Sequence, residues 1–287
     1  MNKDRDIILV TGATGNQGGA IARQLLSKGY QVRAMTRNPE SDKAKSLTRL
    51  GAQVVQGDFD DPQSLERALD GVWGAYAVQN TWEAGVQKEE EQGKLFAEMV
   101  RAKGVGHFVY SSVGSADRNT GIPHFDNKWR IEQKIRELAF PSYTILRPAF
   151  FMDNFLSPWF KPALMEGKLS LALQPDTVLQ MIAVEDIGRF GALAFENHDR
   201  MNGVALDIAG DQRTMPQVAE IISHAMDKRI VFDQRPIEEA RNWNEDFATM
   251  LEWFDRVGYS ADIQGLERKY GFSLIKLPEW AAKAAWR

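Results

Sequence analysis

The sequence contains no cysteine, which excludes disulfide bonds, thiolate catalysis and cysteine-ligated metals. It also lacks any apolar run of roughly 18 residues, the length that a membrane-spanning helix requires. The four histidines show no spacing typical of metal ligands. The lack of cysteine is consistent with a reducing compartment, so we expect a soluble, cytoplasmic protein that binds no metal.

An excess of either charge is also lacking. The 287 residues include 35 Lys and Arg against 39 Asp and Glu, a net charge of −4. This balance gives no indication of nucleic-acid or membrane binding. The segment Met1–Asp6 is charged and leads directly into an apolar strand, which is not typical of a signal peptide. The length allows one large domain or two small ones.

A glycine-rich stretch near the N-terminus, VTGATGNQGG, organises the first third of the chain. The apolar segment 7–10 before it predicts a buried strand, and residues 20–29 after it predict a helix. Strand, glycine turn and helix in this order form the context of a dinucleotide fingerprint, whereas the alternative is an ordinary glycine-rich turn. Such a turn lets the backbone approach a pyrophosphate and directs N–H groups at it. The predicted cofactor contacts here are Gly12, Thr14, Gly15, Asn16, Gln17 and Gly18.

Strands and helices then alternate up to Pro148. Apolar, β-branched segments predict strands, and amphipathic segments between them predict helices. This alternation predicts an α/β protein with a doubly wound parallel sheet, a Rossmann fold. The strands are expected at 31–36, 53–57, 74–78, 106–112 and 142–148, and the helices at 41–50, 63–69, 85–103 and 125–138.

Beyond Pro148 the pattern changes. A short strand near 180–184 leads into a helix to Phe195, and residues 204–208 are expected to return to the main sheet as a strand. A helix at 216–226, capped by Thr214, a strand at 229–232 and a mainly helical remainder follow. We therefore expect a nucleotide-binding core and a smaller, discontinuous C-terminal lobe for a substrate or partner. The expected core is 1–152 together with 178–209, and the expected lobe is 153–177 together with 210–287.

The end of the second strand indicates which dinucleotide is bound. An acid about 20 residues after the turn would bind the ribose hydroxyls of NAD(H) and repel a 2′-phosphate. The sequence instead has Thr36-Arg37-Asn38 there. A guanidinium can grip a phosphate bidentately, worth about ten- to a hundred-fold in affinity. The alternative is a surface arginine paired with an acid such as Asp58. Arg37 therefore favours NADP(H) over NAD(H).

Five motifs resemble the NmrA-like family, whose members are atypical short-chain dehydrogenases/reductases. They are TGATGNQGG, VRAMTRNP, GDFDDPQSL, NTWEAGVQKEEEQGK and HFDNK. The resemblance covers nearly the whole chain, is densest over residues 7–156, and is greatest to the NADPH-sensing members rather than the isoflavone-type reductases.

The resemblance also implies where catalytic residues should lie. The superfamily uses a Tyr-x-x-x-Lys pair and a serine. Lys128 matches the lysine and Ser111 or Ser112 the serine, but His124 replaces the tyrosine. A neutral histidine can exchange a proton near pH 7, so hydride transfer stays possible. We favour the alternative, in which His124 packs beside the nicotinamide and Lys128 only anchors the cofactor.

Further cofactor contacts follow from the resemblance alone. They lie after strands, at the edge where doubly wound sheets bind ligands. Near the adenine we expect Asp58 and Phe59, near the ribose and pyrophosphate Gln79 and Asn80, and over the nicotinamide Phe150, Phe151 and Asn154.

Two functions remain open. The first is an NADP(H)-binding regulator that senses the cofactor, has little or no dehydrogenase activity and acts through a protein partner. The second is an NADPH-dependent reductase of a quinone or other apolar carbonyl that uses His124 and Lys128. Sugar-epimerase chemistry would need the missing tyrosine. The sequence allows a monomer or a homodimer, with the helix at 85–103 as a candidate two-fold contact.

Two other patterns are interpreted structurally. The charged run Lys88-Glu89-Glu90-Glu91 is typical of a solvated helix face. Trp243, Phe247, Met250 and Phe254 fall at spacings that place them on one helical stripe, and we expect this stripe to pack in a core rather than line a substrate pocket.

Overall fold

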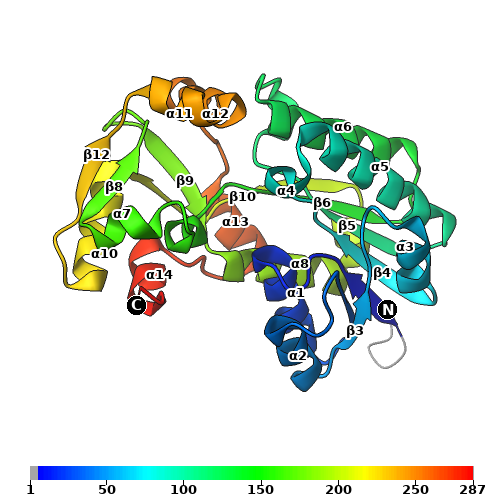
Figure 1. The fold of residues 1–287 in the computed structure, drawn as a ribbon. Coiled ribbons are helices and arrows are strands. Elements are labelled where there is room, and N and C mark those ends of the chain that lie inside the picture. Colours follow the sequence, from blue (N-terminus) through cyan, green and yellow to red (C-terminus); the bar gives the residue numbers. More distant parts are fainter. Residues whose placement is uncertain (1–5, 287) are drawn as a thin grey trace. The chain divides into compact units, whose positions relative to one another are not determined.

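The computed structural model describes residues 6–286, so most of the N-terminal segment Met1–Asp6 lies outside the described residues. The chain forms two compact units (Figure 1). Unit 1 comprises Met1–Ala116, His124–Arg147 and Ile187–Leu206. Unit 2 comprises Asp117–Pro123, Pro148–Asp186 and Asp207–Arg287.

The main sheet has seven strands in the order β10-β6-β5-β4-β1-β2-β3. All the neighbouring strands from β6 to β3 pair in parallel. This arrangement confirms the predicted α/β fold with a large parallel sheet. The strands are β1 (Ile7–Val10), β2 (Gln31–Thr36), β3 (Gln53–Gln56), β4 (Val72–Ala77), β5 (His107–Ser111), β6 (Tyr143–Pro148) and β10 (Val204–Ile208).

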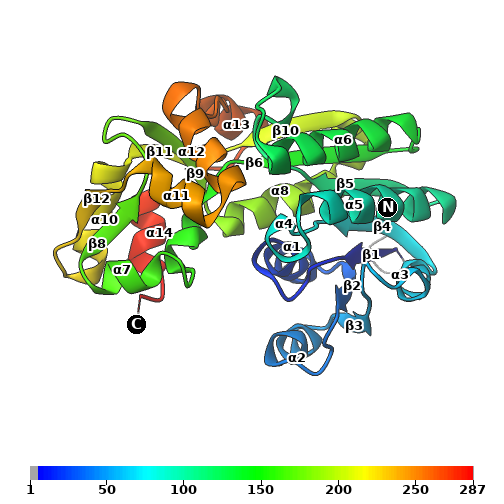
Figure 2. The same cartoon turned by 45° about the horizontal axis from the view of Figure 1, so that its top comes forward.

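Helices cover both faces of this sheet, with α3, α5 and α6 on one face and α1 and α8 on the other (Figures 1 and 2). Phe96 of α5 and Ile131 of α6 pack with Phe108 and Ile145 of the sheet in one buried cluster. Burying this apolar surface holds the strand ends, and hence the site, in place. The helices are α1 (Asn16–Ser27), α2 (Asp42–Arg49), α3 (Pro62–Leu69), α4 (Thr81–Ala84), α5 (Val86–Ala102), α6 (Pro123–Glu137), α8 (Val184–Glu196) and α9 (His198–Met201).

Unit 2 contains two small sheets and short helices. One sheet has the order β11-β9-β7, and the other pairs β12 with β8. A capping box at Thr214 and Gln217 begins α10, as the sequence predicts for Thr214. The strands are β7 (Phe150–Phe151), β8 (Lys168–Leu171), β9 (Val178–Ile182), β11 (Asp211–Thr214) and β12 (Val231–Gln234). The helices are α7 (Lys161–Met165), α10 (Met215–Met226), α11 (Ile237–Trp243), α12 (Glu245–Arg256), α13 (Ile263–Tyr270) and α14 (Leu277–Lys283).

The strand β9 differs from its expected place. We expected residues 178–209 to return to the core, and β10 does join the main sheet. The strand β9 instead pairs with β11 in antiparallel register, from Asp211 opposite Met181 to Thr214 opposite Val178. A five-residue apolar strand fits either sheet, so partners distant in sequence decide its position.

The predicted helical stripe is also interrupted. Helix α11 ends at Trp243, and the extended Asn244 caps α12 by accepting a hydrogen bond from the N–H of Phe247. Met250 and Phe254 are buried as expected, but Trp243 is 55% exposed. A continuous helix was therefore the wrong interpretation, because an asparagine that caps a helix ends the preceding one.

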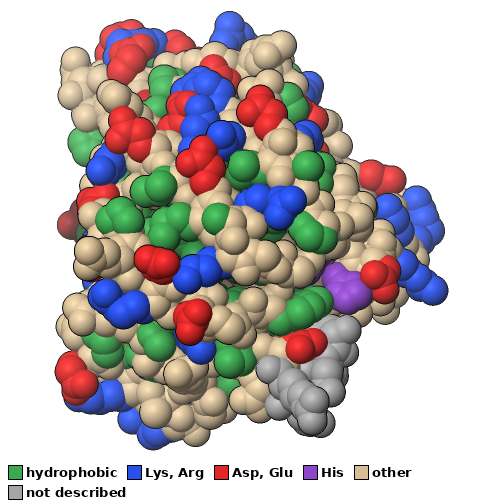
Figure 3. All heavy atoms as spheres, turned by 90° about the vertical axis from the view of Figure 1, so that its right-hand side faces the viewer, with side chains coloured by type: hydrophobic (Ala, Val, Ile, Leu, Met, Phe, Trp, Pro, Cys, Tyr) green, Lys and Arg blue, Asp and Glu red, His purple; other side chains and the backbone are tan. Residues whose placement is uncertain are grey.

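Charges of both signs are interspersed over the face of the molecule that Figure 3 shows, in keeping with the near balance of the sequence. Within residues 6–286, no helix has both the length and the apolar character needed to cross a membrane.

Candidate cofactor site

The glycine turn joins β1 to α1 at the carboxyl edge of the sheet. Gly12 has a φ of +58°, and the N–H of Gly15 donates to its carbonyl at 2.8 Å. A Cβ on Gly18 would lie 2.4 Å from the backbone oxygens of Gly12 and Thr11. Only glycine therefore lets α1 begin this close to β1.

The first turn of α1 has backbone donors that find no partner among residues 6–286. Its N-cap is Gly15, which has no side chain that could accept a hydrogen bond from the helix. The first backbone hydrogen bond of the helix runs from the N–H of Gly19 to the carbonyl of Gly15, at 3.1 Å. The preceding N–H groups of Asn16, Gln17 and Gly18 are therefore available to an anion. Both Gly15 and Asn16 are exposed, so a ligand can reach them.

The side-chain amide of Gln79, which follows β4, indicates whether a polar ligand fits here. It is 5% exposed, and neither its amide nitrogen nor its amide oxygen has a hydrogen-bond partner in the described structure. A buried amide without partners costs about 1–3 kcal/mol. Gln79 thus has the unsatisfied donor and acceptor that a dinucleotide could bind, and with the free N–H groups of α1 it fits such a cofactor.

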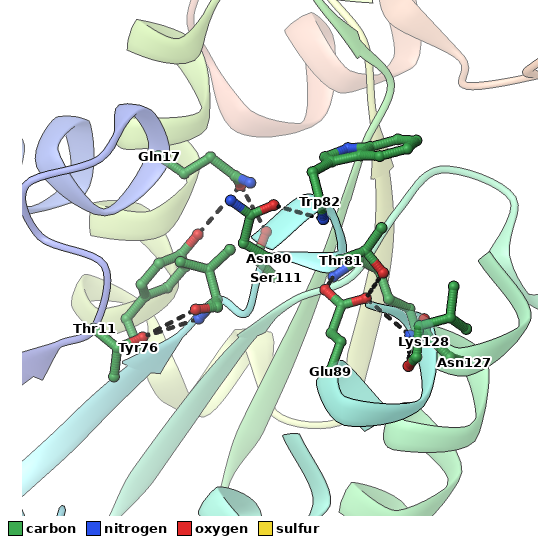
Figure 4. Close-up of polar contacts among 12 residues, drawn as sticks. Thr11, Gln17, Tyr76, Asn80, Thr81, Trp82, Glu89, Ser111, Asn127 and Lys128 are labelled. Carbon is green, nitrogen blue, oxygen red and sulfur yellow. Dashed lines mark hydrogen bonds and ion pairs between the residues drawn. The ribbon is translucent and has the colours of Figure 1, made fainter. Parts of the chain in front are cut away.

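Gln17 links the turn to the neighbouring strands (Figure 4). Its Oε1 accepts hydrogen bonds from Ser111 Oγ at 2.7 Å and from the Tyr76 hydroxyl at 3.3 Å. The predicted catalytic Ser111 is fully buried, and its hydroxyl donates its hydrogen bond to Gln17. The other candidate, Ser112, is also buried, and its Oγ has no hydrogen-bond partner among the described residues.

Lys128 is bound by a glutamate that the sequence analysis missed. Its Nζ lies 2.7 Å from Oε1 of the fully buried Glu89 (Figure 4). Glu89 Oε2 accepts from Thr81 Oγ1 at 2.5 Å and from Asn127 Nδ2 at 2.9 Å. Burial alone would raise the pKa of Glu89, but Lys128 and these hydrogen bonds outweigh it and hold that pKa below its ordinary value.

The interpretation of 88–91 as a solvated face is therefore wrong for Glu89, although Lys88 and Glu91 are exposed. A signal was present in the sequence: Glu89 falls on the same helical stripe as Gly93, Phe96 and Val100, all of which are buried. A carboxylate on an apolar stripe indicates a buried partner.

His124 lies one helical turn before Lys128 on α6 and is 7% exposed. Its ring centroid lies 5.1 Å from that of Trp82 and 4.8 Å from that of Phe125. Aromatic packing thus accounts for the position of the His124 ring.

Arg37 does not pair with Asp58. Its NH2 lies 2.8 Å from Oε2 of Glu83 on α4. Asp58 instead accepts a hydrogen bond from the N–H of Asp60 and so closes its own turn. Asp58 follows β3, the strand next to β2, but its carboxylate is engaged in this local turn.

The other predicted contacts have local partners. Phe59 packs edge-on against Phe96 at 5.4 Å, and Asn80 caps α4 by accepting from the N–H of Trp82. Thr14 bonds Thr36 at 3.3 Å and so links the turn to β2. Phe150 and Phe151 form β7 in unit 2, and Asn154 follows in a 3₁₀ turn there, so their contact with a cofactor stays a prediction.

A parallel doubly wound sheet with a glycine turn, an open helix N-terminus and free polar groups at its carboxyl edge defines a dinucleotide-binding protein. The model of the NmrA-like family matches residues 4–286, and the chain belongs to this family. An NmrA-like family domain-containing protein of Dictyostelium discoideum is 30% identical over 285 residues, with 94% of each chain covered. The resemblance inferred from the motifs is thereby confirmed.

The NmrA-like family domain-containing oxidoreductase FrzB of a Cladobotryum species is 36% identical over 167 residues, and the match spans only 50% of its length. Two solved structures share the fold. The transcriptional regulator NmrA, solved in complex with NADP, is 18% identical with a TM-score of 0.80, covering 98% of this chain and 95% of that one. The triphenylmethane reductase of Citrobacter, complexed with NADP(H), is 23% identical with a TM-score of 0.80, covering 97% and 99%.

Proposed function

We propose that this protein binds NADP(H) at the carboxyl edge of the unit 1 sheet and acts as a cofactor-responsive regulator with little or no dehydrogenase activity. One contrast carries the proposal. Among the described residues, the N–H groups at the start of α1 and the amide of Gln79 are open to a ligand. His124, in contrast, stands where a catalytic tyrosine is expected and packs between aromatic rings, and Lys128 is bound by Glu89.

Different groups of the protein would bind different parts of the dinucleotide. The N–H groups at the start of α1 would hold the phosphates, the free amide of Gln79 a ribose or phosphate oxygen, and Arg37 the 2′-phosphate. Lys128 would anchor the nicotinamide ribose. When bound, the nicotinamide supplies hydride-transfer chemistry.

Sensing requires that one cofactor form binds two conformations of the protein with different affinity. The regulator NmrA, which shares this fold and was solved with NADP, supports a regulatory use of such a site. We place the protein in the cytoplasm, with a protein partner that responds to the bound form.

Calorimetric titration combined with limited proteolysis tests the proposal. We expect NADPH to bind more tightly than NADH and to change the rate at which a protease cleaves the protein. The control is the same digestion with adenosine, which lacks the phosphates. Absence of dinucleotide binding, or binding that leaves cleavage unchanged, would contradict a sensing role.

A reductase of an apolar acceptor is the second candidate. It is supported by the relatives named oxidoreductases and by the triphenylmethane reductase with the same fold. His124 and Lys128 share one face of α6 and would move the proton. Turnover of NADPH that His124→Ala abolishes would favour this candidate over the first.

A further inference from the structure

Glu83 forms an ion pair with Arg37, the residue that would bind the 2′-phosphate. Its Oε2 lies 2.8 Å from Arg37 NH2, and the side chains are 56% and 67% exposed, respectively. Arg37 follows β2, whereas Glu83 lies on α4, which follows β4. Because β2 and β4 both flank β1, this ion pair spans the end of β1, where the glycine turn begins.

The position of Glu83 is fixed by its neighbours on α4. Thr81 is buried and donates a hydrogen bond to the carboxylate of Glu89 (Figure 4). Trp82 packs against His124. Asn80 caps the start of this four-residue helix, and Gly85, with a φ of +85°, ends it. Glu83 is therefore presented to Arg37 by an anchored segment rather than by a freely moving loop.

We propose that Glu83 is a specificity-determining residue that competes with the 2′-phosphate of the dinucleotide for Arg37. The inference rests on the proposed function. A phosphate that binds Arg37 through NH2 must compete with the carboxylate for that group, and it then has a like charge beside it. A dinucleotide without the 2′-phosphate leaves the pair intact. Glu83 thus lowers the affinity for NADP(H) and leaves that for NAD(H) nearly unchanged.

This competition narrows the preference for NADP(H) that Arg37 creates. Exposed ion pairs are weak, so Glu83 weakens phosphate binding without preventing it. The neutral variant Glu83→Gln keeps the shape of the side chain and removes the charge. It should tighten NADPH binding about two- to five-fold and leave NADH binding nearly unchanged, on the order of an exposed charge pair.

Calorimetric titration of the wild type and Glu83→Gln with NADPH and with NADH measures this directly. Glu98→Gln is the matched control, because Glu98 is also exposed and ion-paired, 2.6 Å from Lys134. Its affinities should equal those of the wild type. In an Arg37→Ala background, Glu83→Gln should have a smaller effect on NADPH binding than in the wild type, because the competed group is gone and only the like charge is removed.

Unchanged NADPH affinity in Glu83→Gln, or equal tightening of NADPH and NADH, would overturn the role of Glu83. These results differ from failure of the proposed function, in which the wild type binds neither dinucleotide. Hydrogen exchange gives a second readout. NADPH should speed exchange of the α4 amides relative to NADH in the wild type and not in Glu83→Gln.

Discussion

Lys128 and Glu89 form a buried ion pair in which each charge depends on the other. Removing one partner leaves the other charge buried and uncompensated. We predict that Lys128→Met lowers the free energy of unfolding by about 3–5 kcal/mol. Lys134→Met removes the solvent-accessible pair with Glu98 and should cost much less.

Urea unfolding of the two variants provides the measurement. Adding Glu89→Gln to Lys128→Met should recover part of the loss, because no buried charge then remains. Equal destabilisation by the two lysine substitutions would show that the Lys128 pair is not effectively buried.

Arg37 is the single residue expected to determine the preference for NADPH over NADH. Arg37→Ala should weaken NADPH binding about ten- to a hundred-fold, because a charge-assisted phosphate contact is lost, and should leave NADH nearly unaffected. Fluorescence or calorimetric titration with both dinucleotides measures the two affinities. Equal losses for both cofactors would show that Arg37 does not contact the 2′-phosphate.

The sequence could predict some of these residues and not their partners. Arg37 could be predicted as a phosphate ligand because the end of a strand and the absence of an acid there can both be recognised in a short stretch of sequence. Its partner Glu83 lies on α4, after another strand, and only the strand order brings the two together. Glu89 was missed because charge density was given more weight than helical position.

At the scale of elements, Gly18 sets how closely α1 packs on β1. Gly18→Ala should lower the free energy of unfolding by about 3 kcal/mol, the upper end of the usual cost of overpacking. Its Cβ would contact backbone oxygens, which cannot rotate away. Gly29→Ala is the control: no atom lies near its Cβ, and only its φ of +80° is strained, which costs about 1 kcal/mol.

Thermal unfolding and NADPH titration of the two alanine variants distinguish these causes. Gly18→Ala should also lose cofactor affinity because the start of α1 shifts, whereas Gly29→Ala should keep it. If Gly18→Ala is as stable as Gly29→Ala, Gly18 does not set how closely α1 packs on β1.

Elements with a clear period were predictable, and those defined by distant partners were not. Buried strands and amphipathic helices up to Pro148 follow local apolar patterns. The sheet to which β9 belongs depends on its pairing with β11. The break between α11 and α12 depends on one capping residue, Asn244, within an otherwise continuous stripe.

At the scale of the whole molecule, His107 makes stability depend on pH. Burial, aided by the nearby His198, lowers the pKa of His107 from 6.5 to about 3. The unfolded chain therefore binds a proton below pH 6.5 that the folded protein does not, and stability falls as the pH decreases toward 3. Between pH 6.5 and about pH 5 the loss from this group is about 2 kcal/mol.

Urea unfolding at neutral pH and at about pH 5 measures this dependence. In His107→Asn, which cannot take up the proton, the decrease between the two pH values should be smaller than in the wild type by that amount. An identical decrease in both proteins would exclude His107 as its source.

A cofactor-responsive regulator binds the dinucleotide without consuming it. The most direct test of this follows nicotinamide absorbance after the protein, saturated with NADPH, is mixed with a panel of quinones and triphenylmethane dyes. We predict no decrease in this absorbance beyond the rate of the protein-free control. Rapid NADPH oxidation that His124→Ala abolishes would contradict it.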